Sequence, residues 1–384
     1  MSEKKRIIVT VITDLVTDQR VNKVCTSLSD NGYEVFLIGA LWKNSLPLVK
    51  RNYKAIRLPM FFHKKVWFYA EFNIRLFFKL LFTKGDIFLG NDLDVMPATF
   101  LAARLKRKPV VYDTHEYFLG MPQLNNKPLV KKVWTLTERF IFPRLNHIYT
   151  ICQSFCDLYY KDYGKKLSYI RNVPMLNVAD TGQFEHLKKE IEAKLPLNKN
   201  LLLLQGTGIN IERGGEELVL SMQYLDPEKF HLLIIGGGEV FEILIKMVSD
   251  LHLEDRITIL PKVPPEVLRY ITRKAALGFT LDKPNNINHL YGLPNKIFDY
   301  LHAGIPVLSS RLVELEHIIA DYEVGAFIEN HDPNHIAARI KEIFEQPDTM
   351  AKWKANTQKV KKDFNWELEE KKLISIFQAV SSNS

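Results

Sequence analysis

The chain has 384 residues, of which 46% are hydrophobic and 25% are charged. This composition is that of a globular protein, and the length excludes a single ordinary hydrophobic core, so we expect two domains. The formal net charge of +8 is compatible with nucleic acid, a membrane surface or an anionic substrate and does not choose among them.

Three cysteines, Cys25, Cys152 and Cys156, form no disulfide framework, and the last two lack further ligands at metal-binding spacing. The first residues, MSEKKRIIVTVIT, pass from a short charged leader into an apolar run that is too short for the core of a signal peptide. We therefore expect a reducing, cytoplasmic location, with the first strand at this point.

Residues 6 to 171 alternate short aliphatic runs with helical patterns. The expected strands are Ile7 to Ile12, Glu34 to Ile38, Asp86 to Leu89, Val110 to Tyr112, His147 to Ile151 and Leu167 to Ile170. Strands that alternate with helices require right-handed crossovers, so the pattern predicts a parallel, doubly wound sheet. Ligands of such sheets bind at the carboxyl ends of the strands.

The aromatic segment 61–82 is the part of the chain that comes nearest to a membrane signal. The continuous apolar run that a spanning helix needs is broken by His63, Lys64, Lys65, Glu71, Arg75 and Lys79. We therefore expect no transmembrane helix here.

Two interpretations of this segment stay open. Helical spacing connects Trp67, Ala70, Ile74, Phe77 and Leu81, which predicts a helix packed on a sheet through that face. The other face presents Phe68, Phe72 and Phe82 beside basic residues, which is typical of a peripheral helix on anionic lipid.

Polar residues follow the first strand. Asp18 precedes a helical pattern that contains Arg20. An aspartate at this place can cap the helix, with the arginine at the surface. Alternatively, both residues belong to a site at the strand end.

Two further polar clusters follow two later strands. They are Asn91, Asp92 and Asp94 after one strand, and Asp113, His115 and Glu116 after the next. Because these strand ends share one edge of the sheet, the clusters should meet there as a candidate site. A metal centre is an alternative that no fixed ligand spacing supports, and a structural histidine satisfied by Asp113 is another.

Residues 173–199 lose the alternation and gain proline and charge, so we interpret them as a linker between a first domain, 1–172, and a second, 200–360. The second domain repeats the alternating pattern. Its first strand ends at Gln205 and Gly206, where a ligand can approach the backbone, and Arg213 and Gly214 open the next helix, where a guanidinium can bind a diphosphate. The tail, 361–384, has the pattern of one more helix.

Three consecutive glycines, Gly236 to Gly238, follow the next strand. As a dinucleotide fingerprint this is weak, because Phe241 replaces the third glycine of the pattern. A tight turn near a ligand is the favoured interpretation.

The central motif of the second domain is NINHLYGLPNKIFDYLHAGIPVLSS, residues 286–310. Pro294 suits the first turn of a helix and Asn295 can cap it. Ile297, Tyr300 and Leu301 fall on one face, and Gly304 ends the helix before a short buried strand. Asp299 lies one turn inside, where a carboxylate can accept hydrogen bonds from a sugar diol.

The run LPNKIFDYLHAGIPV resembles the donor-site signature of nucleotide-sugar glycosyltransferases with the GT-B fold, particularly the retaining family 4 enzymes. In that family an acidic residue on this helix holds the nucleotide ribose, which implies this role for Asp299. The family has another acid eight positions earlier, where this chain has Tyr291. This departure puts the grip on the transferred sugar in question.

The resemblance implies further roles. The DQRV run with Asp18 and Arg20, and the NDLD and YDTHE runs, look like the acceptor side of such enzymes, where the histidine equivalent to His115 lies beside the reacting sugar. In the second domain, Arg213 occupies the lysine position of the family's phosphate loop, while Thr207 replaces its usual arginine. Lys262 and Val263 would lie at the nucleobase, and Gly292, Asn295 and Lys296 at the donor.

The resemblance covers about residues 6 to 380 and implies a GT-B fold, with two Rossmann-like doubly wound domains facing a central cleft and the C-terminal helix returning to the first domain. It further implies metal-independent, retaining transfer of a sugar from a nucleotide diphosphate donor to a glycan or lipid-linked acceptor. Surface polysaccharide or glycolipid synthesis on the inner face of the membrane would suit such an enzyme. We expect no cofactor and no nucleic acid, and an anionic membrane surface as a further partner.

Two alternatives stay open. Nucleotide-sugar 2-epimerases have the same fold and bind the same donors, and a catalytically inactive sugar-nucleotide binding module is favoured by Tyr291. Incubation with a panel of donors separates the three, since the outcome is transfer to an acceptor, an isomerised donor, or binding without product.

Overall fold

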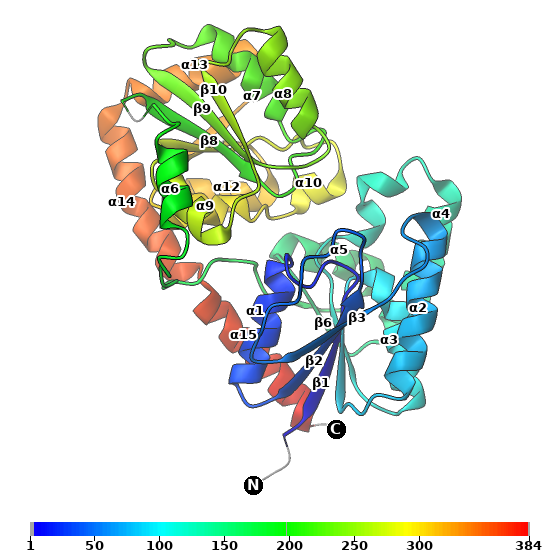
Figure 1. Ribbon diagram of the computed structural model, residues 1–384. Coiled ribbons are helices and arrows are strands. Elements are labelled where there is room, and N and C mark those ends of the chain that lie inside the picture. The colour runs from blue at the N-terminus through cyan, green and yellow to red at the C-terminus, as the bar shows by residue number, and fades with distance from the viewer. Residues whose placement is uncertain (1–3, 197, 383–384) are drawn as a thin grey trace. The chain divides into compact units, whose positions relative to one another are not determined.

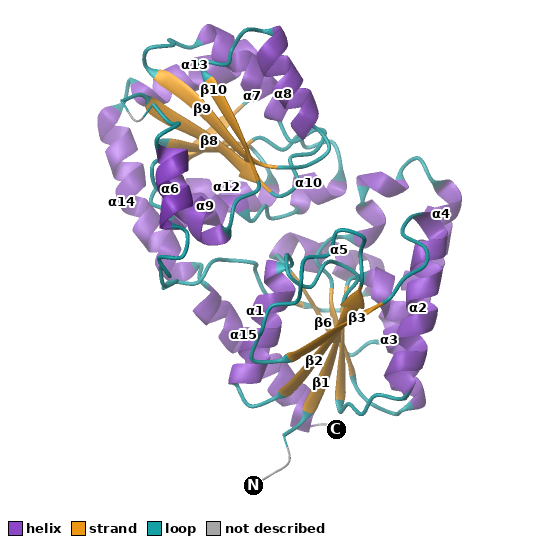
Figure 2. Cartoon of the chain, in the orientation of Figure 1, coloured by secondary structure: helices purple, strands orange, loops and turns teal. Residues whose placement is uncertain are grey.

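The computed structural model describes residues 4–196 and 198–382. The chain divides into two compact units, one of Met1–Asn172 with Leu368–Ser384 and one of Val173–Glu367. Each unit is a parallel β-sheet with helices on both faces, so the prediction of two doubly wound domains is confirmed (Figures 1 and 2). The segment expected to be a linker, 173–199, belongs to the second unit and contains a helix, α6 (Glu185–Glu192).

The sheet of the first unit has the strand order β3-β2-β1-β4-β5-β6-β7 among the described residues, and every pairing in it is parallel. Its strands are β1 (Arg6–Thr10), β2 (Glu34–Ala40), β3 (Lys54–Leu58), β4 (Ile87–Asn91), β5 (Val110–Asp113), β6 (His147–Thr150) and β7 (Ser168–Tyr169). The edge strand β3 was not expected. Charged residues stand at two of its five positions, Lys54 and Arg57, and most of it is half-exposed, so it lacks the continuous apolar run of the inner strands.

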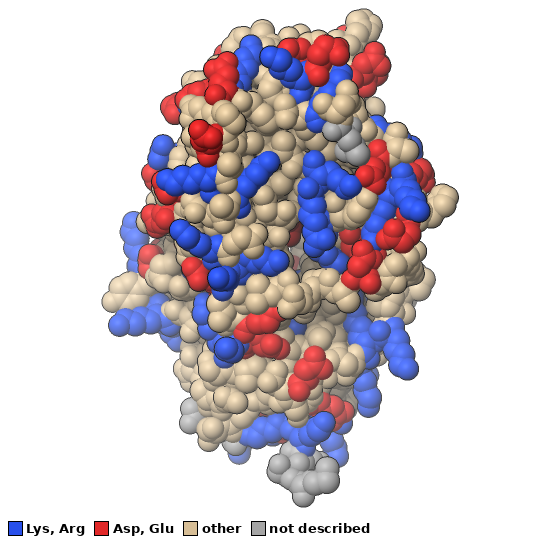
Figure 3. All heavy atoms as spheres, turned by 90° about the vertical axis from the view of Figure 1, so that its left-hand side faces the viewer, with Lys and Arg blue, Asp and Glu red and all other residues tan. Residues whose placement is uncertain are grey.

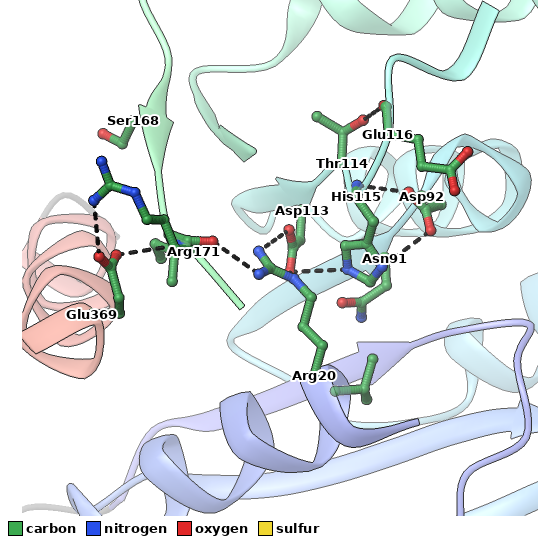
Figure 4. Close-up of polar contacts among 12 residues, drawn as sticks. Arg20, Asn91, Asp92, Asp113, Thr114, His115, Glu116, Ser168, Arg171 and Glu369 are labelled. Atoms are coloured by element: carbon green, nitrogen blue, oxygen red, sulfur yellow. Dashed lines mark hydrogen bonds and ion pairs between the residues drawn. The ribbon is translucent and has the colours of Figure 1, made fainter. Parts of the chain in front are cut away.

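The helices of the first unit are α1 (Gln19–Asp30), α2 (Lys65–Leu81), α3 (Met96–Leu105), α4 (Pro128–Ile141), α5 (Gln153–Tyr163) and α15 (Trp366–Ser382). Single 3₁₀ turns are η1 (Leu93–Val95), η2 (Phe118–Gly120), η3 (Pro122–Leu124) and η4 (Phe142–Arg144). The last helix, α15, packs in this unit through buried Leu373 and Phe377. Glu369 anchors it by accepting a hydrogen bond from the backbone of Arg171 at 3.1 Å (Figure 4).

Helix α2 packs on the sheet through a different face from the one expected. Phe68, Phe72 and Leu76 are at most 2% exposed, whereas Trp67 and Ile74 are 68% and 59% exposed. The helix carries two apolar stripes, and spacing alone does not tell which of them meets the sheet. The expected inner and outer faces were therefore exchanged at these positions. Phe77 and Leu81 still pack partly against the core and Phe82 is exposed, as the prediction had them.

The sheet of the second unit has the order β10-β9-β8-β11-β12-β13 among the described residues. Its strands are β8 (Asn200–Gly206), β9 (Phe230–Gly236), β10 (Ile257–Pro261), β11 (Leu277–Thr280), β12 (Val307–Ser310) and β13 (Gly325–Ile328). Its other helices are α7 (Gly215–Ser221), α8 (Phe241–Asp250), α9 (Pro265–Thr272), α10 (Ile287–Tyr291), α11 (Lys296–His302), α12 (Val313–Tyr322), α13 (Pro333–Phe344) and α14 (Pro347–Asp363), with a 3₁₀ turn η5 (Met222–Tyr224).

Both sheets change winding direction at an inner strand pair. In the first unit the order reverses between β1 and β4, and in the second between β8 and β11. A crevice forms outside the carboxyl ends of the strands at such a switch point, and ligands of open α/β sheets bind there. The loops after β1 and β4 in one unit, and after β8 and β11 in the other, are therefore the places where site residues should gather.

No helix in the described part of the chain is both long and apolar enough to cross a membrane, in agreement with the expectation for residues 61–82.

Candidate active site

Four of the predicted residues form one chain of ion pairs at the carboxyl edge of the first sheet (Figure 4). Arg20 donates to both oxygens of Asp113, from Nη2 at 2.8 Å and from Nε at 3.1 Å. His115 lies between Asp113, 3.1 Å from its Nε2, and Asp92, 3.2 Å from its Nδ1. The side chains of Arg20 and Asp113 are 5% and 0% exposed, so this end of the chain of ion pairs lies inside the protein.

His115 carries a positive charge in this arrangement. Burial lowers the pKa of His115, but Asp92 and Asp113 outweigh that effect and raise it to about 9. Conversely, burial raises the pKa of Asp113, and Arg20 with His115 lowers it to about 2. At neutral pH the imidazole is therefore an imidazolium held by two carboxylates. Its chemistry is that of a positive charge and hydrogen-bond donor, and a cation of this kind does not act as a general base.

Asp92 is the most exposed member of the chain of ion pairs, with a side chain 24% exposed against 18% for His115. Its backbone adopts φ 63° and ψ 165°, a region that an L-residue rarely occupies. The backbone N–H of His115 donates to its Oδ1 at 2.8 Å, which holds this conformation in place. Strained backbone next to titratable groups is typical of functional sites.

The remaining first-unit candidates lie around this cluster. Asp18 caps α1 by accepting from the Val21 N–H at 3.0 Å, so it does what the capping interpretation expected. Arg20, expected in that interpretation at the surface, is buried instead. Asn91 is buried and donates to the Thr10 carbonyl at 3.0 Å, while Glu116 is exposed (Figure 4).

Asp94, which follows the same strand, is 9% exposed. Burial, with a contribution from Asp92, raises its pKa well above the ordinary value.

No group of three or more histidine, cysteine and acidic side chains in the described residues has the geometry to hold a metal ion.

The second unit gathers two cations around one carboxylate. Arg213 Nη1 lies 3.5 Å from Asp282 Oδ1, and Lys296 Nζ lies 3.6 Å from Asp282 Oδ2. Lys296 is 11% exposed and Arg213 33%, so both cations can contact a bound anion without leaving the carboxylate.

Glycines bring the loops of this site together. Gly214 has φ +73°, and a Cβ there would lie 2.4 Å from Cβ of Leu281, so the loop before α7 can rest on the loop after β11 only as glycine. Gly238 has φ +141° and equally close contact with the backbone of Ile209. The glycine run therefore makes a tight turn against the loop after β8, as the favoured interpretation expected.

Asp299 lies in the first turn of α11, half-buried, as the motif predicts. Gln205 Nε2 donates to its Oδ2 at 3.3 Å, and the Gln205 Oε1 accepts from Thr272 Oγ1 at 2.8 Å. The Tyr300 hydroxyl accepts from the backbone N–H of Gln205 at 3.0 Å. Gln205 is thus held at its backbone and at both ends of its amide.

The other donor-side candidates take various positions. Lys262 is exposed after β10, with its Cε 3.0 Å from where a Cβ on Gly237 would lie, and Val263 is half-buried. Asn295 stands at the N-cap of α11 but makes no side-chain capping bond, which departs from the expectation. Gly292 is buried. A Cβ added at Gly206 would meet its nearest neighbour, the Ile209 side chain, at 3.6 Å, so there is room beside this backbone.

Asp282 and Gln205 are the site residues that sequence reasoning did not assign a role. Both stand at the carboxyl ends of β11 and β8, the strand pair at the switch point. An acid two residues after the strand LGFT is a usable signal once the strand order is known.

Two protein-family models match the chain. The model described as Glycosyltransferase Family 4 matches residues 19–173, and the model described as Glycosyl transferases group 1 matches residues 188–360. A comparison with curated proteins found no match.

Several solved structures are similar over almost the full length. Sucrose-phosphate synthase from Thermosynechococcus elongatus matches with a TM-score of 0.80 at 15% identity, covering 99% of this chain and 100% of that chain. HepE from Anabaena, in complex with UDP and glucose, matches with a TM-score of 0.75 at 12% identity, covering 98% and 100%. A putative UDP-N-acetylglucosamine 2-epimerase from Listeria monocytogenes matches with a TM-score of 0.62 at 11% identity, covering 100% and 98%.

The two doubly wound domains define a GT-B fold. Since each half of the chain matches a glycosyltransferase model, the chain belongs to the group 1 glycosyltransferases.

Proposed function

We propose that the enzyme moves a sugar from a nucleotide diphosphate donor to a hydroxyl of a glycan or lipid-linked acceptor, with retention at the anomeric carbon. The observation that carries the donor assignment is the pair of cations Arg213 and Lys296 at the carboxyl edge of the second sheet. Asp299 lies on the same helix as Lys296, where its carboxylate can take a ribose diol. Together these groups match the charge and hydrogen-bond pattern of a nucleoside diphosphate.

In the reaction, the largest charge develops on the departing diphosphate. Arg213 and Lys296 would neutralise it, which lowers the barrier most when the cations are already in position. His115, as an imidazolium beside the reacting sugar, would stabilise the negative charge that develops on the departing diphosphate. Asp92, the more exposed partner of His115, is the carboxylate available to a hydroxyl of the acceptor.

Epimerisation of the donor is the competing reaction, because the fold serves both chemistries. A panel of nucleotide sugars with mixed glycan acceptors distinguishes them. We expect a glycosylated acceptor and a free nucleoside diphosphate. An isomerised donor without transfer would favour the epimerase, and nucleotide binding without any product would leave a binding module.

We also propose that the enzyme works at an anionic membrane on the cytoplasmic side, in surface polysaccharide or glycolipid synthesis. The surface in question is formed by α2, α3 and α4, which we call the α2–α4 face. Helix α3 contacts both others (Figure 1). The rings of Tyr69 on α2 and Trp134 on α4 lie 5.8 Å apart.

Large apolar side chains are exposed along all three helices of this face. Those at least 48% exposed are Val66, Trp67, Ile74, Phe78, Leu101, Leu105, Leu129, Val133, Leu136 and Phe140. An apolar surface of this extent marks an interaction site on a soluble fold.

The charges of this face are basic. Lys79, Arg104, Lys132 and Arg139 are exposed. The acidic residues of the three helices are Glu71, which is 11% exposed and paired with Arg75, and Glu138, which is buried. By contrast, basic and acidic side chains are interspersed on the face shown in Figure 3. Apolar side chains with basic neighbours fit an anionic lipid surface.

Co-sedimentation with vesicles tests this proposal. Lys132→Glu with Arg139→Glu should lower the partition coefficient on anionic vesicles by at least about tenfold, because each basic residue near such a surface contributes about 1 kcal/mol. The matched control is Ile243→Gln with Ile245→Gln on α8, residues 50% and 43% exposed in the second unit, which should bind like wild type. Equal recovery with neutral and anionic vesicles would refute the proposal. It would also be refuted if the protein forms a stable dimer that Leu136→Gln dissociates, because the α2–α4 face would then be an interface between two copies.

A further inference from the structure

Asp282 is a buried carboxylate between the two cations of the donor site. Its side chain is 2% exposed, and each of its oxygens faces one cation, Arg213 at 3.5 Å and Lys296 at 3.6 Å. Neither oxygen accepts a shorter hydrogen bond from the described residues. One negative charge inside the protein is therefore shared between two positive ones.

The backbone on either side of Asp282 is fixed. The N–H of Lys283 donates to the Glu212 carbonyl at 2.8 Å. On the other side, Leu281 lies against Gly214, where a Cβ would approach to 2.4 Å. The loop after β11 is thus pinned to the loop before α7, which carries Arg213, so the carboxylate has little freedom to follow either cation.

Lys296 needs a counter-charge at this position. Burial lowers the pKa of Lys296, Asp282 opposes that shift, and the neighbouring Arg213 adds to it. A neutral amine would lose the charge-assisted bond to a phosphate, which is roughly twice as strong as a neutral one.

Resting on the proposed function, we infer that Asp282 is a positioning residue for the donor diphosphate. It keeps Lys296 protonated inside the site and holds Lys296 and Arg213 on opposite sides of one carboxylate. A nucleoside diphosphate then meets two cations that are already charged and oriented, and the enzyme need not order them during binding.

The deprotonation of Lys296 can be distinguished from that of the other titratable groups around Asp282. Groups that interact with it include Arg213, His289, Lys296, Tyr300 and His331. Burial lowers the pKa of His289 and of His331 and raises that of Tyr300. A guanidinium does not lose its proton in proteins. Among these groups, Lys296 is the cation whose lowered pKa brings its loss of charge from the alkaline side closer to neutral pH.

The experiment is isothermal titration of a nucleoside diphosphate over pH 7 to 10 with the full chain. Wild type should lose affinity at the alkaline end as Lys296 deprotonates. In Asp282→Asn this loss should begin at least about one pH unit lower, since an opposite charge within 4–6 Å shifts a pKa by about 1–3 units. The ratio of the variant's dissociation constant to that of wild type should therefore be about ten times larger near pH 9 than at pH 7.

Three variants make the result specific. Glu217→Gln removes the carboxylate that pairs with Lys283 at 2.5 Å in the same loop region, and it should keep the wild-type pH profile. Asp282→Glu keeps a carboxylate at this position and should largely keep the wild-type pH profile as well. Lys296→Arg, alone or with Asp282→Asn, should show no alkaline loss, because the guanidinium stays charged.

An unshifted alkaline loss in Asp282→Asn overturns the inference. Should that variant fail to fold, Lys296→Arg decides: an unchanged alkaline loss there overturns the inference, and a flat profile supports it. If wild type binds no nucleoside diphosphate at any pH, the proposed function itself is wrong, which this titration separates from failure of the Asp282 role.

Discussion

Asp299→Ala should weaken binding of a nucleoside diphosphate by at least about tenfold. A hydrogen bond to a charged group contributes roughly 1.5–3 kcal/mol, and about 1.4 kcal/mol is one decade of affinity. Gln205 already donates to Oδ2 of Asp299 at 3.3 Å, so part of the carboxylate is engaged before a ribose arrives. We therefore count the loss of one ribose bond rather than two, which gives the tenfold lower limit.

Thr272 provides a matched pair of variants for the same carboxylate. Its hydroxyl donates to Gln205 Oε1 at 2.8 Å, which turns the amide so that Nε2 faces Asp299. Thr272→Val keeps the shape and removes this hydroxyl, so the amide can rotate and present its oxygen to Asp299. We expect a several-fold loss of affinity in Thr272→Val and wild-type affinity in Thr272→Ser.

The assay compares a ribonucleoside diphosphate with its 2′,3′-dideoxy analogue by isothermal titration. Wild type should prefer the ribonucleotide, and Asp299→Ala should barely distinguish the two while binding the dideoxy analogue as wild type does. A thermal melt checks that the fold is intact. If Asp299→Ala retains the full preference, Asp299 is not the ribose ligand and the donor-site assignment fails.

His115→Ala should lower turnover by on the order of 100-fold with donor affinity near wild type, and unchanged turnover in steady-state kinetics would contradict a role in the chemical step. The pKa of about 9 for His115, above the unfolded value of about 6.5, means that its stabilising contribution is complete below that unfolded value and is lost as pH rises through 9, so His115→Gln should flatten the fall in melting temperature over this range. Arg20→Met should lower the melting temperature markedly, because Asp113 would be left as a buried charge with one partner fewer; a melting temperature within a degree or two of wild type would refute this.

The two strand-end clusters of the first unit were predictable because the rule that governs them is local. A strand, a polar run and a helical pattern can all be read from adjacent residues, and the edge at which parallel strands end follows from the crossovers. What the pattern could not supply was the partner of Arg20. It pairs with Asp113, far along the chain, and only the sheet order brings the loop after β1 close to the end of β5.

The same distinction explains the expectations that were wrong. Helix α2 has two apolar stripes, and which one is buried depends on the sheet below it, so Phe68 and Phe72 are inside and Trp67 is outside. Asp282 gained significance only when β11 was found next to β8, because this pairing places its carboxylate between Arg213 and Lys296. Sequence spacing carries no information about that contact.

The charge balance of the two clusters differs in a way that suits the proposed roles, the acceptor side in the first unit and the donor side in the second. In the first unit, Arg20 and His115 are balanced by Asp92 and Asp113, so these four side chains carry no net charge when all are ionised, which suits the proposed uncharged acceptor. In the second, two cations share Asp282, which leaves one positive charge unbalanced within this trio beside the proposed diphosphate site, while the Asp299 carboxylate lies at the proposed ribose position. Because charge attraction is strong where water is scarce, this local positive charge would favour the proposed anionic donor in the second unit.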